Sequence, residues 1–224
     1  MPHYNANNER VLVFPTNILL SIGYFEGLCY DVDKYLPLIL ENNIYMKREK
    51  IESDSNFKQL IPYVIICYKD LIIRYRRGVL LNEKRLEGKN SIGIGGHISI
   101  TDASEMKNNY IMGMAREINE ELVIKTTYKT YLKALLNDDS NNVGKVHFGL
   151  IYVMRLDEPK VRKRELSIND LKFINKIELK SNISEYENWS RICIKDIDRL
   201  ISSKVKGKKS IYNKNNCEYT AESK

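Results

Sequence analysis

The most informative stretch of the chain spans residues 110–124 and reads YIMGMAREINEELVI. Its apolar residues recur at the three- and four-residue intervals of an amphipathic helix. The buried stripe that this spacing predicts consists of Ile111, Met114 or Ala115, Ile118 and Leu122. We therefore expect a helix here that continues to about Glu121.

Three glutamates on this helix, Glu117, Glu120 and Glu121, are related by i, i+3 and i, i+4 spacing. They project from one side of the helix and repel one another, and the helix dipole disfavours anions near its C-terminal end. A hard divalent cation would relieve this repulsion, because carboxylate oxygens are the ligands that Mg²⁺ and Mn²⁺ prefer. The spacing alone equally fits a solvated helix face, so both interpretations stay open at this point.

Composition narrows the class of protein. The chain has 224 residues, a mass of 26.2 kDa and a formal net charge of +7. Four cysteines lie far apart without a C-x-x-C pair, which argues against a zinc knuckle or a disulfide scaffold. No apolar run approaches the ~20 residues of a membrane span, and the polar N-terminus has no apolar signal core. We therefore expect a soluble, cytoplasmic protein with no membrane partner.

The C-terminus is basic. Its last 22 residues hold six lysines and two glutamates, so they contribute more than half of the net charge. No arginine–aromatic pattern accompanies these lysines, and nucleic acid is not an expected partner. Residues 204–224 are therefore predicted to be a flexible, solvated tail.

The remaining pattern alternates strands with helices. Apolar runs predict a strand at 11–14, a hairpin over 61–77 with a turn at Lys69 and Asp70, a glycine-interrupted strand at 91–100 and a long strand over 143–156. Helices are expected at 35–42 and 185–204. Asp102 and Glu105 have the spacing of a capping box before the glutamate-bearing helix. Strands flanked by helices indicate an α/β or α+β domain.

Residues 116–121, REINEE, follow a Gly95–Gly96 turn at the end of a strand, and together they resemble the signature of the Nudix hydrolases. That signature is G-x(5)-E-x(7)-R-E-U-x-E-E-x-G-U, with U a bulky aliphatic residue. The R-E-U-x-E-E core matches in full, and Ile124 fills the last aliphatic position. QLIPYVI, VHFGLIYV and EYENWS extend the resemblance over roughly residues 55–200, to a divergent subgroup of predicted Nudix phosphoesterases.

The match departs from the signature in three places. Gly96 stands 20 residues before Arg116 where the signature has 14, so the loop is six residues longer. Asn108 occupies the position of the first glutamate, and Val123 replaces the glycine at the helix end. Without that glycine, the left-handed helix cap is not expected.

The resemblance implies a site for one to three divalent cations, Mg²⁺ or Mn²⁺. Glu120 and Glu121 become the main ligands, Glu117 is a third ligand or the base that activates water, and Gly95 adds its backbone carbonyl. Arg116 completes the implied catalytic group as a structural residue, paired with a carboxylate that holds the loop against the helix. Since Asn108 replaces the usual glutamate, the loop residues Asp102 and Glu105 are the alternatives for that partner.

Other polar residues have both a functional and a structural interpretation. His97 either contacts a phosphate or the metal, or makes a structural hydrogen bond, and His147 is expected in the core. Glu187 is either the additional acidic residue that family members place on a distant loop or a helix-surface residue. Basic residues around the hairpin either meet an anionic substrate or serve solubility. These are Arg74, Arg76, Arg77, Arg85 and Lys89, of which we assign Arg74, Arg76 and Lys89, with His97, to substrate binding.

The resemblance implies an α/β/α sandwich with a mixed sheet, in which residues 1–55 are an N-terminal extension and 56–203 the Nudix-like domain. The implied activity is metal-dependent hydrolysis of a nucleoside diphosphate linked to another group. The alternative is a catalytically silent module that binds a nucleotide or a partner. An allylic diphosphate isomerase is a third option, although Cys67 in mid-strand is a poor candidate for its acid. A homodimer is a family-level expectation.

Overall fold

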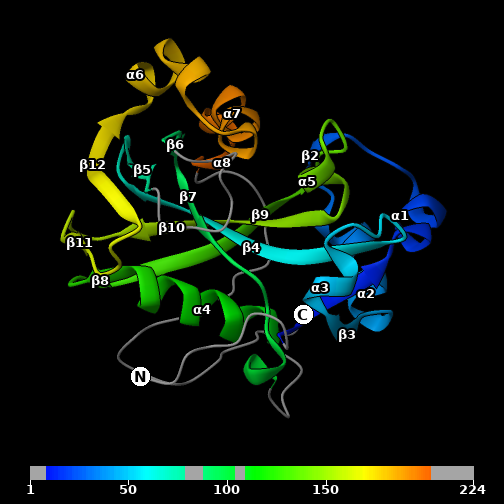
Figure 1. Cartoon of the computed structure of the whole chain (residues 1–224). Helices are drawn as coiled ribbons and strands as arrows, with labels where there is room; N and C mark the ends of the chain where they lie inside the picture. The colour runs from blue at the N-terminus through cyan, green and yellow to red at the C-terminus, as the bar shows by residue number, and fades with distance from the viewer. Residues whose placement is uncertain (1–8, 79–87, 104–108, 203–224) are drawn as a thin grey trace, which may run out of the picture. The chain divides into compact units, whose positions relative to one another are not determined.

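The computed structural model describes residues 9–78, 88–103 and 109–202 (Figure 1). Its contacts divide the chain into two compact units, formed by Met1–Pro62, Gly95–Arg116 and Ala134–Leu150, and by Tyr63–Ile94, Glu117–Lys133 and Ile151–Lys224. Five elements contribute to both units: β4 (Phe57–Tyr68), β7 (Gly93–Gly95), α4 (Asn109–Glu121), β9 (Tyr128–Asn137) and β10 (His147–Leu156). Strands and helices alternate in both units, which confirms the predicted mixed α/β class.

The first unit is built around the N-terminal half of β4. Its own elements are β1 (Arg10–Pro15), α1 (Thr16–Ile22), β2 (Gly27–Cys29), α2 (Val32–Glu41), β3 (Ile44–Lys47), α3 (Arg48–Ile51), the 3₁₀ helix η3 (Ile100–Asp102) and α5 (Asn142–Lys145). Strand β1 pairs antiparallel with β3 and with β4, and β2 pairs with β9. Val11, Val13 and Ile51 form a fully buried cluster beside them. Residues 9–55 therefore add strands to the sheet, while the separation of residues 1–55 as an extension stays a prediction.

The second unit continues the sheet in the order β12-β5-β4-β10-β9. Its own elements are β5 (Leu71–Arg77), β6 (Asn90–Ser91), β8 (Leu122–Ile124), β11 (Val161–Lys163), β12 (Ile168–Asn175), α6 (Lys176–Ser181), the 3₁₀ helix η4 (Ile183–Glu185), α7 (Asn188–Lys195) and α8 (Ile197–Leu200). The predicted hairpin is confirmed: β4 and β5 pair through Cys67↔Ile72, and Lys69 takes a φ of 53° in the turn. Cys67 is 2% exposed, as expected of a small core residue.

Three local predictions are wrong. The capping box joins Ser99 to Asp102, in η3, rather than Asp102 to Glu105, which lies outside the described residues. Residues 142–145 are a short helix and not the start of a strand, because the Asn141 side chain accepts the Gly144 N–H at 2.9 Å and caps the turn. The predicted helix at 185–204 is divided into η4, α7 and α8, since the backbone at Asp196 leaves helical geometry.

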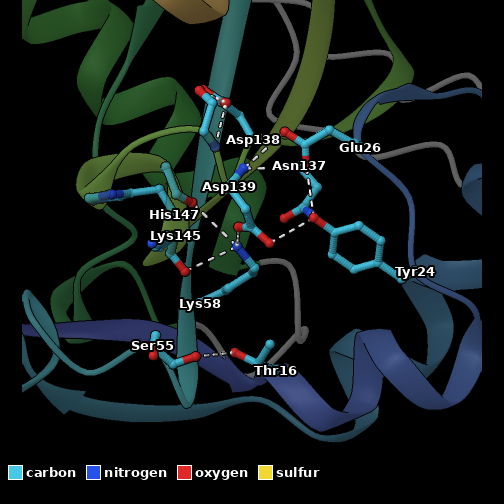
Figure 2. A network of polar contacts seen from close by, with 12 residues as sticks. Thr16, Tyr24, Glu26, Ser55, Lys58, Asn137, Asp138, Asp139, Lys145 and His147 are labelled. Atoms are coloured by element: carbon cyan, nitrogen blue, oxygen red, sulfur yellow. Dashed lines mark hydrogen bonds and ion pairs between the residues drawn. The ribbon is translucent and has the colours of Figure 1, made fainter.

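A buried lysine connects β4 to the loop before β10 (Figure 2). Lys58 is 1% exposed, and its Nζ donates to Asp139 Oδ1 at 2.7 Å and to the Gly144 and Lys145 carbonyls at 3.3 and 3.1 Å. On the exposed side, the Tyr24 hydroxyl bonds to both Glu26 and Asp139, and these carboxylates raise its pKa. The ammonium group thus replaces its lost hydration with three acceptors.

We expect Lys58→Met to lower the free energy of unfolding by about 2 kcal/mol, because two buried carbonyls and one carboxylate lose their donor. Lys160→Met is the matched control, since Lys160 forms an exposed pair with Glu158 that contributes at most about 1 kcal/mol. Urea denaturation of both variants measures the difference. Equal decreases in the free energy of unfolding of the two variants would show that the buried Lys58–Asp139 pair stabilises the fold no more than the exposed pair does.

Candidate active site

An ion pair fastens the loop after the glycine turn to helix α4. Arg116 Nε and Nη2 donate to the two carboxylate oxygens of Asp102 at 2.8 and 3.0 Å, and Nη2 also donates to the His97 carbonyl at 2.8 Å. Asp102 is 8% exposed and in addition accepts the Ser99 N–H. Two parallel charge-assisted bonds fix the relative orientation of both groups. Of the two predicted partners for Arg116, Asp102 is therefore confirmed; Glu105, like Asn108, lies outside the described residues.

Gly113 permits this close approach of loop and helix. A Cβ atom at Gly113 would lie 3.0 Å from Asp102 Oδ2 and 3.3 Å from the Ile98 Cα. Both distances are shorter than ordinary van der Waals contact, and one of the two atoms belongs to the backbone. A larger residue at this position would push the loop away from α4.

The two described histidines meet in the first unit. The Nε2 atoms of His97 and His147 are 3.3 Å apart, and His147 Nδ1 lies 2.7 Å from the Val143 carbonyl. That carbonyl can only accept, so Nδ1 of His147 carries a hydrogen. Burial, together with the charge of Arg48, holds the pKa of His97 well below its usual value. His147 is 6% exposed, as expected of a core residue, and His97 makes the structural hydrogen bond that was one of its two interpretations.

The three glutamates lie in the second unit, at the C-terminal end of α4. Glu120 is exposed, whereas Glu117 and Glu121 are half-buried. Loss of hydration and then the charge of Glu117 raise the pKa of Glu121 to about 8, with smaller contributions from Glu165 and Glu120, while Arg77 opposes the shift. The backbone N–H groups of Arg164 and Glu165 bond to the Glu121 carbonyl, which explains the proximity of Glu165. The sequence gives no signal for this fourth carboxylate.

The donor chemistry of this group fits a hard divalent cation, because all of its members supply carboxylate oxygens. In residues 9–78, 88–103 and 109–202, however, no three His, Cys, Asp or Glu side chains are arranged to hold a metal ion. Glu117 and Glu120 take part in other interactions. Binding a cation would require these side chains to rotate toward one another. Gly95, the predicted carbonyl ligand, belongs to the first unit.

Glu187 has a structural role that the sequence did not indicate. It is 6% exposed and caps α7 by accepting the Trp189 and Ser190 N–H groups at 2.7 and 2.9 Å. The Tyr63 hydroxyl donates to its Oε1 at 2.8 Å. Neither a helix surface nor a distant loop describes this buried position.

The basic residues assigned to substrate binding come together in a cavity whose described lining includes none of the three glutamates of α4. Arg74, Arg76 and Lys89 line one cavity. Side chains alternate between the two faces of a strand, so Arg74 and Arg76 point to the face of β5 opposite Tyr75 and Arg77. The charge of Glu121 contributes to the raised pKa values of both of those residues. Arg85 lies outside the described residues.

Comparisons with known proteins show which family the chain resembles in sequence and in fold. The sequence is 32% identical over 155 residues to Protein YmaB of Bacillus subtilis strain 168, covering 66% of this chain and 75% of that protein. The fold matches Tm1382, a protein assigned provisionally to the Nudix hydrolases, with a TM-score of 0.74 and 27% identity over 86% of this chain and 100% of Tm1382. The chain belongs to the Nudix hydrolase superfamily.

A more distant solved structure shares the fold alone. DR0079 from Deinococcus radiodurans gives a TM-score of 0.50 at 13% identity, covering 72% of this chain and 92% of DR0079. No protein-family model matches the chain. The predicted superfamily and its α/β fold are thus confirmed by the structural match. None of the described helices is both long and apolar enough to cross a bilayer.

We expect a double-mutant cycle on Asp102→Asn and Arg116→Gln to show a coupling of about 1–2 kcal/mol in the free energy of unfolding. Asp102→Asn removes the charge that the guanidinium faces. In that background, Arg116→Gln should lower the free energy of unfolding by less than it does in the wild type. Guanidinium denaturation of the four proteins measures the coupling. Strictly additive losses would show that the pair does not stabilise the loop against α4.

Proposed function

We propose that this Nudix protein is a divalent-cation-dependent hydrolase that cleaves the phosphoanhydride of a nucleoside diphosphate linked to another group. The observation that carries the proposal is the environment of Glu121. This carboxylate is half-buried at the end of α4, with the negative charges of Glu117, Glu120 and Glu165 near it and Arg77 opposing them. Such a group lowers the stability of the fold unless a cation joins it. Membership of the superfamily supports the class of reaction.

In this proposal Glu120 and Glu121 hold Mg²⁺ or Mn²⁺, with Glu117 as a third ligand or as the base, and the Gly95 carbonyl stays a predicted ligand. When bound, the cation supplies charge neutralisation for the diphosphate and lowers the pKa of water. The nucleotide-type substrate carries the complementary negative charge. That the protein forms a homodimer and that it is cytoplasmic also stay predictions.

The protein residues then have separate tasks. As the base, the Glu117 carboxylate accepts a proton from the attacking water, for which a partly desolvated position is suitable. The Arg116–Asp102 pair holds the glycine loop at α4, so that the loop backbone keeps one conformation during turnover. Arg116 is therefore a positioning residue and not a group that meets the substrate.

Removing one ligand should weaken metal binding. We expect Glu121→Gln to bind Mn²⁺ at least tenfold more weakly than the wild type in equilibrium dialysis, because one anionic donor is lost. Glu178→Gln is the control, since Glu178 is exposed on α6 in the same unit. Identical affinities in wild type and Glu121→Gln would remove Glu121 from the site.

Activity and stability should change in opposite directions in Glu120→Gln. The substitution is nearly isosteric and relieves repulsion with Glu117 and Glu121, so the melting temperature without metal should hold or rise slightly. Turnover should fall by a factor of about 100 or more, because several kcal/mol of transition-state stabilisation depend on the bound cation. The assay measures release of mononucleotide or phosphate from nucleotide sugars, dinucleoside polyphosphates, ADP-ribose and oxidised nucleoside triphosphates with and without Mg²⁺. Full metal-dependent turnover by this variant would refute the assignment.

The second candidate is a catalytically silent module that binds a nucleotide or a protein partner. It is favoured by Asn108, which stands where the signature has its first glutamate. The same substrate panel separates the two functions. Metal-dependent release of product by the wild type excludes the silent module, whereas saturable nucleotide binding without turnover supports it.

A further inference from the structure

A polar cavity lies in the second unit and is lined by residues of β5, β6, β12 and η4, and by Gly88 and Lys89. Its volume is about 420 Å³, which falls within the ~300–1,000 Å³ range of small-molecule sites. The residues that matter for recognition are Arg74, Arg76, Lys89, Asn90, Ser184 and Glu185. All of them belong to one unit, so the cavity is complete within it.

The cavity has more cationic than anionic groups. Arg74 pairs with Asp170, its Nη1 lying 2.5 Å from Oδ2, and the buried Nε of Arg74 has no hydrogen-bond partner among the described residues. Within that same part of the chain, neither Arg76 nor Lys89 forms an ion pair. Arg76 uses its Nε to donate to the Gly88 carbonyl at 2.9 Å, which fixes the guanidinium and leaves its terminal amino groups for a ligand. A planar arginine beside a lysine suits a phosphate group.

Three other lining residues, Asn90, Ser184 and Glu185, offer hydrogen-bonding groups for hydroxyls. Asn90 Nδ2 donates to Glu185 Oε2 at 3.1 Å, which orients the carboxylate. An ionised carboxylate accepts several hydrogen bonds, so Glu185 retains capacity for a ligand. Ser184 adds a hydroxyl that both donates and accepts. A ligand that carries both a phosphate and hydroxyl groups would match the cationic residues and the hydrogen-bonding residues of the lining.

The backbone of the cavity wall is irregular. The β5–β12 register shifts between Asn169 and Lys172, and Asp170 adopts a φ of 46° there. A positive φ is costly for a residue other than glycine, and bulges of this kind redirect side chains beside binding sites. Here the irregular segment directs the Asp170 carboxylate onto Arg74 and thereby holds the guanidinium in the wall.

The described lining of the cavity includes no residue of the glutamate group. Arg74 and Arg76 occupy one face of β5, whereas Tyr75 and Arg77, which interact electrostatically with Glu121, occupy the other. A ligand held by Arg76 therefore does not share the face of β5 that interacts with Glu121. For this reason we infer that these basic residues do not bind the substrate of the carboxylate site, although the sequence analysis assigned them to that substrate.

We propose that the cavity is a second binding site, independent of the carboxylates, for a small phosphate ester that carries hydroxyl groups. Arg76 and Lys89 bind the phosphate, and Glu185 and Ser184 bind the hydroxyls. Sugar phosphates and nucleoside monophosphates share this chemistry. The proposal does not depend on the hydrolase activity.

The test is isothermal titration calorimetry of the full chain with EDTA present, which prevents phosphate binding through a divalent cation. The probes are ribose 5-phosphate, adenosine 5′-monophosphate, inorganic phosphate and ribose. Arg76→Gln is the main variant, because Arg76 is exposed and its loss should not affect folding. Arg191→Gln removes an equally exposed arginine on α7 as the matched control, and Glu120→Gln tests independence from the carboxylates.

We expect at least one of the two esters to bind more tightly than inorganic phosphate or ribose. Arg76→Gln should raise its dissociation constant at least tenfold, and the other two variants should leave it within twofold. Tighter binding of the monophosphate identifies a nucleotide site, and equal binding of both esters identifies a sugar phosphate site. No saturable binding of either ester, equal binding of inorganic phosphate, an unchanged constant in Arg76→Gln, or loss of binding in Glu120→Gln would each overturn the proposal.

Discussion

The salt bridge between Arg116 and Asp102 is the interaction on which the geometry of the glycine loop depends. It joins a residue of α4 to a loop residue 14 positions earlier, and both hydrogen bonds are between charged groups. The same arginine binds the His97 carbonyl, and the same aspartate caps η3 through Ser99. The loop conformation, helix α4 and the backbone at His97 are therefore coupled through two side chains.

The glutamate group, unlike the Arg116–Asp102 pair, lowers the stability of the folded chain. Since folding raises the pKa of Glu121, the folded chain binds protons more readily than the unfolded chain, and stability declines as the pH rises from about 4.5 toward about 8. A structural helix end would carry basic residues at these positions. The chain instead retains adjacent anions, which is the pattern expected where stability has been traded for ligand binding.

The sequence predicts the parts of this structure that depend on residue patterns within a single segment. The amphipathic pattern of α4 and the β4–β5 hairpin follow from residue spacing within one segment. The role of the REINEE core and the choice of Asp102 or Glu105 for Arg116 come from the resemblance to the Nudix signature. Contacts between distant segments are not encoded in that way. Glu165 approaches Glu121 through backbone hydrogen bonds, and Glu187 is buried because Tyr63 reaches it from 124 residues away. Helix α5 escaped prediction because its cap, Asn141, stands in a run of polar residues typical of a loop.

Buried Lys58 has a consequence for how β4 finds its partners. From Leu60 to Cys67 every residue of this strand is buried on both faces, so the usual alternation of polar and apolar residues does not distinguish one pairing from the next. Sliding the strand by one residue would turn the ammonium group away from Asp139 and leave a bare charge inside the protein. Such a state costs several kcal/mol, whereas the apolar residues would lose little by the same shift. Together with the Tyr63 hydroxyl, which bonds to buried Glu187, the Lys58 ammonium group thus disfavours misaligned pairings that the hydrophobic residues alone would tolerate.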